Sequence, residues 1–127
     1  MRFAARADMD LPIDTAFDRL SDFAAFERIA AKRGVEVERT GKAGDADAWH
    51  LKFRLRGKLR AMALTLDRCD RPEALAFLGE SKSFSLHGVI TLIALSRTRT
   101  RLGTEIDVRP RTLSGRLFLQ SMRLVKS

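Results

Sequence analysis

The chain has 127 residues, 45% of them apolar, and its 24 Lys and Arg against 16 Asp and Glu give a formal net charge of +8. This length suits one compact domain over residues 1–127 with its own apolar core. The longest apolar run, 88–95, is far shorter than the roughly 20 residues that cross a bilayer, and a single cysteine, Cys69, excludes an internal disulfide and a cysteine-rich metal site. The composition predicts a cytoplasmic globular domain without a metal or other cofactor.

The positive charge favours acidic partners such as anionic lipid, nucleic acid or another protein. Nucleic-acid-binding proteins usually combine clustered basic residues with exposed aromatic ones. Here Arg and Lys alternate singly with apolar residues, as in 49–56. That pattern is typical of the solvated face of a sheet, so we expect no nucleic-acid partner and keep an anionic membrane surface as an open alternative.

The N-terminal third predicts a strand followed by two short helices. Apolar and polar residues alternate over 3–11, and Pro12 ends this strand. Asp14 is a candidate cap for a first amphipathic helix, and Asp22 is the candidate N-cap of a second. A basic last turn followed by Gly34 predicts where the second helix ends.

The remainder predicts an antiparallel meander and a closing helix. After a polar turn at 41–47, alternation is clearest from Trp49 to Arg56. Apolar residues on both faces of 84–95 suggest a bulge near Gly88. A helical stripe predicts an amphipathic helix from Thr112 onward. The expected strands after the helices are 35–39, 49–56, 59–69, 74–79, 84–95 and 100–108.

Two stretches carry a resemblance to a known family. The spacing of Leu, Pro, Asp, Phe, Leu and Asp from Leu11 to Asp22, and the Pro110 to Leu113 entry into the last helix, resemble the START-like superfamily, also called Bet v 1-like or SRPBCC. That superfamily includes polyketide cyclases and lipid carriers. The resemblance implies an α+β helix-grip fold, in which a curved seven-stranded antiparallel sheet wraps a C-terminal helix and two short helices follow the first strand.

The resemblance also implies a cavity between the sheet and the last helix that holds an apolar ligand. The closing helix is shorter here than is usual in the superfamily, so we expect a shallower cavity. Large apolar residues on the concave face, small residues that leave room there, and one polar group on the last helix are the predicted ligand-binding positions, with ordinary core packing as the alternative for the large ones. These positions are Ala5, Ala7, Trp49, Phe53, Met62, Leu64, Phe84, Leu102, Thr104, Leu117 and Ser121.

No catalytic residue is predicted. His50 and His87 are the only histidines; His87 would act as a general base only if its strand turned it toward the cavity, and no motif pairs Cys69 with a base. The absence of tyrosine disfavours a polyketide cyclase, whose cavities commonly carry several polar or aromatic hydroxyl groups. We therefore expect a carrier or sensor for a lipid-like, quinone or aromatic molecule.

Two alternatives are a polyketide cyclase/dehydrase-like enzyme using the same cavity and a protein-interaction module with a filled interior. Convergence of two or more polar groups inside the cavity would favour the enzyme. The sequence does not identify the ligand or the oligomeric state.

Overall fold

The computed structural model describes residues 1–41 and 47–126, so most of the turn expected over 41–47 lies outside the described residues. The strands are β1 (Arg2–Met9), β2 (Glu36–Arg39), β3 (Ala48–Leu55), β4 (Lys58–Asp70), β5 (Ala74–Glu80), β6 (Phe84–Ala94) and β7 (Thr100–Pro110). The helices are α1 (Ile13–Leu20), α2 (Phe23–Lys32) and α3 (Leu113–Lys126). Within the described ranges, no helix is long and apolar enough to cross a membrane.

The strands form one curved sheet in the order β1-β7-β6-β5-β4-β3-β2, and every neighbouring pair is antiparallel. After β2, each strand pairs with its successor through β7, as short connections favour. β1 instead joins the far side of the sheet and pairs with β7 from Arg2 opposite Asp107 to Met9 opposite Thr100. The predicted helix-grip fold class is confirmed.

Local signals account for most of the helix boundaries. The Asp22 carboxylate accepts a hydrogen bond from the Ala25 backbone N–H at 3.2 Å, which confirms it as the N-cap of α2. Gly34 follows α2 with a φ of +85°, a conformation that glycine adopts without steric cost. The expectation for Asp14 is wrong: Pro12 occupies the N-cap position of α1, and Asp14 lies in the first helical turn without a capping bond.

The bulge lies elsewhere than predicted. β6 pairs in regular register on both sides, with Gly88 opposite both Phe77 and Ile106, so the expectation of a bulge near Gly88 is wrong. The register shift is on β4, between Leu66 and Arg68. The apolar residues of both faces of β6 are accommodated without a bulge because part of the outer face is itself apolar and exposed.

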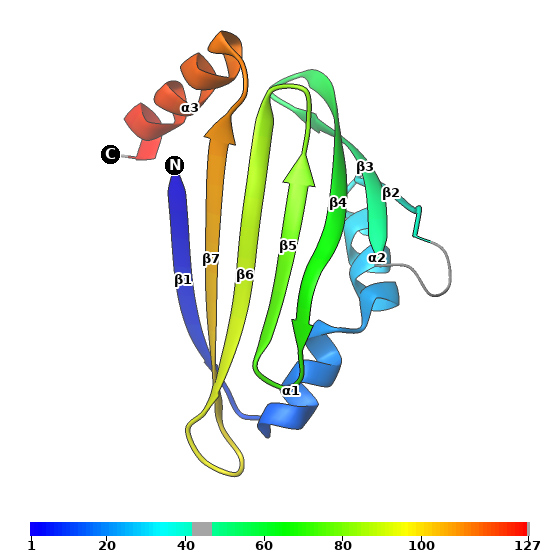
Figure 1. The fold of residues 1–127 in the computed structure, drawn as a ribbon, viewed down its shortest axis with the longest axis vertical. Helices are drawn as coiled ribbons and strands as arrows, with labels where there is room; N and C mark the ends of the chain where they lie inside the picture. The colour runs from blue at the N-terminus through cyan, green and yellow to red at the C-terminus, as the bar shows by residue number, and fades with distance from the viewer. Residues whose placement is uncertain (42–46, 127) are drawn as a thin grey trace.

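All three helices cover the same face of the sheet. Leu92, which contacts α1, and Phe84, which contacts α3, are an even number of residues apart on β6, so their side chains share a face. Figure 1 shows α3 at one end of the long sheet, beyond the end of β7, and α1 at the opposite end, with α2 beside β3 and β4. The concave face is thus covered from two separate ends.

The end covered by α1 contains the main core. Ala16 and Phe17 of α1 pack against Leu75 and Leu92, all four at most 4% exposed. Thr100, fully buried, donates its hydroxyl hydrogen to the Leu11 carbonyl at 2.8 Å. This bond satisfies a buried polar side chain where β1 leaves the sheet toward α1.

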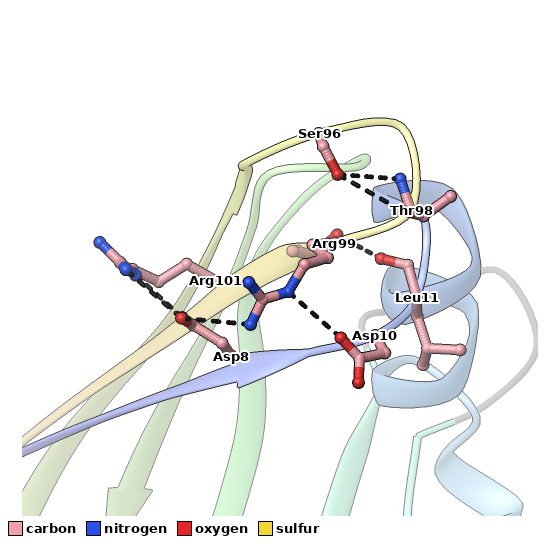
Figure 2. A network of polar contacts seen from close by, with 8 residues as sticks. Asp8, Asp10, Leu11, Ser96, Thr98, Arg99 and Arg101 are labelled. Carbon is pink, nitrogen blue, oxygen red and sulfur yellow. Dashed lines mark hydrogen bonds and ion pairs between the residues drawn. The ribbon is translucent and has the colours of Figure 1, made fainter.

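An exposed polar network lies beside the same connection (Figure 2). Arg101 donates to Asp8 at 2.9 Å across the β1–β7 pair, and Arg99 donates to Asp10 at 3.2 Å. The hydrogen bond from Arg101 lowers the pKa of Asp8 below its ordinary value. Because these groups are exposed, water and salt screen the network, and it fixes local geometry more than it stabilises the fold.

Candidate ligand-binding site

A cavity of about 510 Å³ lies between α3 and the concave face, within the size range of small-molecule sites. Twelve of the sixteen residues that line it are apolar. They come from five strands (β1, β3, β4, β6 and β7) and α3: Phe3, Phe53, Leu55, Leu59, Ala61, Met62, Phe84, Leu86, Val108, Phe118, Leu119 and Met122. The chemistry of this lining suits an apolar molecule.

The first turn of α3 is held against the β5–β6 turn by its backbone. The Thr112 hydroxyl accepts a hydrogen bond from the Gly115 N–H at 3.0 Å and so caps the helix. The Ser83 carbonyl accepts from the Arg111 N–H at 2.7 Å. A Cβ atom on Gly115 would lie only 2.5 Å from the Ser83 carbonyl oxygen, so this approach requires glycine.

The middle of α3 is held by an aromatic contact and two cations. Phe118 packs edge-on against Phe84, with ring centroids 5.6 Å apart. The guanidinium groups of Arg56 and Arg60 lie 4.8 and 5.0 Å from the centroid of the Phe118 ring. Arg56 also donates to the Ser121 hydroxyl at 3.1 Å, which links the β3–β4 hairpin to α3.

The hairpin that supplies Arg56 is tight. Arg56 and Gly57 have φ angles of 52° and 77°, the left-handed pair that a two-residue turn between antiparallel strands requires. Arginine is rarely found in this conformation because its Cβ approaches the neighbouring carbonyl. The contacts with Phe118 and Ser121 are interactions that offset this strain.

Four polar residues complete the lining, namely Arg60, Ser81, Lys82 and Ser83. The Ser81 hydroxyl is engaged in its own turn, where it accepts from the Phe84 N–H at 3.1 Å. Neither a carboxylate nor a histidine lines the cavity among the residues described. The lining therefore offers cations and one hydroxyl, Ser83, and no acid–base pair.

Three of the eleven predicted ligand-binding residues, Phe53, Met62 and Phe84, line this cavity. Leu117 instead borders an adjoining hollow between α3 and the β3–β4 hairpin, which Arg60 and Phe84 also border. Ser121 is not among the lining residues; its hydroxyl donates to the Phe118 carbonyl at 2.7 Å and accepts from Arg56.

The other large predicted residues lie toward the end of the concave face that α1 and α2 cover, where side chains fill the space (the filled end). Trp49 is 2% exposed and packs edge-on against Phe23 of α2 at 5.1 Å. Leu64 lies opposite Trp49 on β4, and Leu102 packs against the α1 core. Trp49, Leu64 and Leu102 are all absent from the cavity lining.

The small predicted residues lie on an uncovered part of the concave face. Ala5 and Ala7 are exposed on β1, and the Thr104 hydroxyl is 3.4 Å from the Ala5 carbonyl. The room that these residues leave is open to solvent. Figure 1 shows α3 and α1 at opposite ends of the sheet, with the middle of β1 between them.

Glu27 links α2 to β2 and β3 at the filled end. Its carboxylate oxygen Oε1 accepts from Trp49 Nε1 at 2.9 Å and from Arg39 Nε at 2.8 Å. Burial raises the pKa of Glu27, but the hydrogen bonds from Trp49 and Arg39 outweigh it and hold the pKa below its ordinary value. This carboxylate holds α2 against β2 and β3 and is not among the residues that line the cavity.

Neither histidine nor the cysteine is among the residues that line the cavity, although His50 borders a separate hollow next to Ala61 and Met62. His87 is exposed and lies opposite Leu78 and Asp107, on the face of β6 opposite to Gly88 and Leu86. The condition for a general base at His87, an inward orientation, is not met. Cys69 is exposed at the end of β4.

Several lining residues were missed, above all Phe3, Leu86, Leu119, Met122 and Arg60. Alternation assigns Phe3 and Leu86 to the concave face but does not say which end of that face is hollow. Arg60, Met62 and Leu64 share one face of β4 because they are two residues apart. Arg60 therefore lies on the apolar face of its strand, where a solvated cation is not expected. That departure from the pattern is the sequence signal that could have marked Arg60 as a lining residue.

No family model and no curated protein matches the chain. Solved structures do match it: the Zhui aromatase/cyclase from Streptomyces sp. R1128 has a TM-score of 0.72 at 16% identity, covering 88% of this chain and 69% of its own. A START superfamily protein from Mycobacterium smegmatis has a TM-score of 0.65 at 13% identity, with 98% and 92% covered.

A third structure, Ara h 8.0201, has a TM-score of 0.66 at 11% identity, covering 89% of this chain and 79% of its own. Together with the seven-stranded antiparallel sheet, these likenesses identify the START-like helix-grip fold, as the resemblance implied.

Proposed function

We propose that the protein binds a small hydrophobic molecule, lipid-like, quinone or aromatic, in the cavity between the sheet and α3, as a carrier or sensor. The observation that carries this proposal is the apolar lining of a cavity of about 510 Å³. A packed protein interior has few voids larger than a water molecule. A large apolar cavity beneath a helix is therefore a typical binding site for a small apolar molecule.

An enzyme of the cyclase/dehydrase type is less well supported. Acid–base chemistry needs titratable groups within reach of the substrate. Among the described residues the lining holds Arg60, Lys82 and two serines, of which Ser81 is engaged by its turn. An interaction module with a filled interior is also less favoured. Such a module would have side chains packed between α3 and the sheet, where this protein has a cavity.

We further propose that the cavity end of the protein touches an anionic membrane surface in the cytoplasm. Leu59, Leu113 and Leu117 are 65%, 73% and 57% exposed there. Cations of the same hairpin, turn and helix surround them, namely Lys58, Lys82, Arg111 and Arg116. Exposed leucines with a cationic rim suit the interface of an anionic bilayer.

The cavity assignment is tested by titrating the purified protein with 1-decanol, a neutral single-chain probe, by calorimetry. Leu86→Trp adds an indole to the cavity lining and is expected to weaken binding at least about tenfold. Leu78→Trp is the matched control, because Leu78 is an exposed leucine on the outer face of β5. Equal binding by both variants would place the probe elsewhere.

Native mass spectrometry of freshly purified protein, followed by lipid analysis of what dissociates, would identify the natural ligand class. If the protein is recovered empty and neither 1-decanol nor a panel of fatty acids, sterols and quinones shifts its melting temperature, the ligand-binding function is excluded. Cosedimentation with phosphatidylserine vesicles, compared with neutral phosphatidylcholine vesicles, tests the membrane contact.

A further inference from the structure

Arg60 lies at the boundary between the cavity and the adjoining hollow, because it borders both. Its guanidinium Nε is fully buried and has no hydrogen-bond partner among the described residues. One side of the guanidinium lies over the Phe118 ring. A ring face attracts a cation but does not accept the hydrogen bond of a buried N–H, so the donor is unsatisfied.

The charged residues that border the cavity and the adjoining hollow are all positive. Lys58 borders the hollow, Lys82 borders both spaces, and Arg56 shares the Phe118 ring. None of these four cations takes part in an ion pair within residues 1–41 and 47–126. Residues 48–66, which carry the hairpin, contain no Asp or Glu.

Such an arrangement is costly without an anion. A partly buried cation loses hydration, and neighbouring cations add repulsion unless an opposite charge is present. The seven salt bridges of the described structure involve other arginines, and no Asp or Glu is among the residues that line the cavity or the adjoining hollow. The site is electrostatically complementary to a negatively charged group.

We propose that the ligand is an amphipathic anion, whose acid group pairs with Arg60 while its apolar part occupies the cavity. This inference rests on the proposed ligand-binding function and narrows it to acidic molecules. The apolar part would lie among Phe53, Met62 and Leu86, and the acid group would face the hollow that leads out past Lys58 and Lys82.

Arg56 acts as a positioning residue in this arrangement. Its contacts with Phe118 and Ser121 fix α3 against the hairpin, and the same ring lies beneath Arg60. The buried Nε of Arg60 is thereby held at the cavity wall. A preorganised donor binds an anion more tightly because less side-chain entropy is lost on binding.

Calorimetric titration of the full chain with sodium decanoate and with 1-decanol at neutral pH and equal ionic strength tests the proposal, since the two probes differ only in the head group. We expect decanoate to bind about tenfold to a hundredfold more tightly, the range of a hydrogen bond to a charged group. Added salt should reduce this preference but leave the affinity for 1-decanol nearly constant.

Arg60→Gln should abolish the preference with little loss of 1-decanol binding, and Arg60→Lys should restore part of it. Arg54→Gln is the matched control, because Arg54 is exposed on the same hairpin and takes part in no described ion pair. Circular dichroism would confirm that each variant is folded.

Equal affinity of the unmodified protein for both probes, or a preference that survives in Arg60→Gln, would overturn the acidic-ligand inference while leaving the hydrophobic cavity in place. Absence of binding by either probe would overturn the acidic-ligand inference, and the melting-temperature panel described above would then decide the ligand-binding function. Because the comparison of probes in the unmodified protein is decisive by itself, the inference is testable even if the variants fail to fold.

Discussion

The two ends of the concave face differ in how their covering helices are seated. At the α1 and α2 end, Phe17 and Phe23 project onto the sheet, and Trp49 and Leu75 meet them as buried residues. At the α3 end, the helix is held at its first turn by Gly115 and at its middle by Phe118. One end is packed, whereas a partly open cavity remains beneath the helix at the other end.

This contrast shows that a single apolar face serves both stability and binding. Apolar alternation is equally regular along β3, where Trp49 is buried in the core and Phe53, four residues later, lines the cavity. The side chains brought by the helix, rather than those of the strand, decide which outcome occurs. The proposed function therefore depends on how α3 is seated.

The largest expected effect comes from truncating one phenylalanine at each end. Phe17→Ala removes a ring that is 3% exposed and should lower the free energy of unfolding by about 3–5 kcal/mol. Phe53→Ala should cost at most about 2 kcal/mol, because its ring already faces open space and makes fewer contacts. Urea denaturation measures both, and equal losses would contradict a hollow second end.

A smaller effect is expected from Gly115→Ala. Helix propensity alone predicts a gain of about 1 kcal/mol, but the added Cβ would meet the Ser83 carbonyl at 2.5 Å and push α3 away from the sheet. We expect a net loss of about 1–2 kcal/mol and weaker binding of 1-decanol. Gly88→Ala is the control, because the nearest atom to its Cβ is 3.9 Å away; stabilisation by Gly115→Ala would show that α3 is not seated on Ser83.

The smallest expected effect concerns pH at the packed end. Since the pKa of Glu27 is lowered in the folded protein, its contribution is present above the unfolded-state pKa and is lost as the pH falls through the folded-state value. Glu27→Gln should cost about 1 kcal/mol at neutral pH and should reduce the loss of stability that sets in as the pH falls below the unfolded-state pKa of a glutamate. Chemical denaturation at several pH values measures this.

Glu38→Gln provides the control for that experiment, because Glu38 is exposed on β2 and takes part in no described ion pair. An identical pH dependence in Glu27→Gln and the unmodified protein would mean that the Trp49 and Arg39 hydrogen bonds do not contribute to stability in solution.

Local sequence patterns were sufficient for the elements and their faces. Alternation predicted the strands because side chains on a strand point to opposite faces, and Asp22 and Gly34 marked the ends of α2 because capping depends on adjacent residues. Register was less predictable: the bulge lies between Leu66 and Arg68, not near Gly88, since it depends on the pairing partner as well as on the strand.

The amino-acid sequence by itself therefore determined the order of elements, the apolar face of the sheet and the START-like fold. Only the tertiary structure decided which part of that face is hollow and that the buried Nε of Arg60 borders it without a hydrogen-bond partner among the described residues. The physical reason is that these properties depend on contacts between distant residues, such as Gly115 with Ser83 and Arg56 with Ser121, and local periodicity does not encode such contacts.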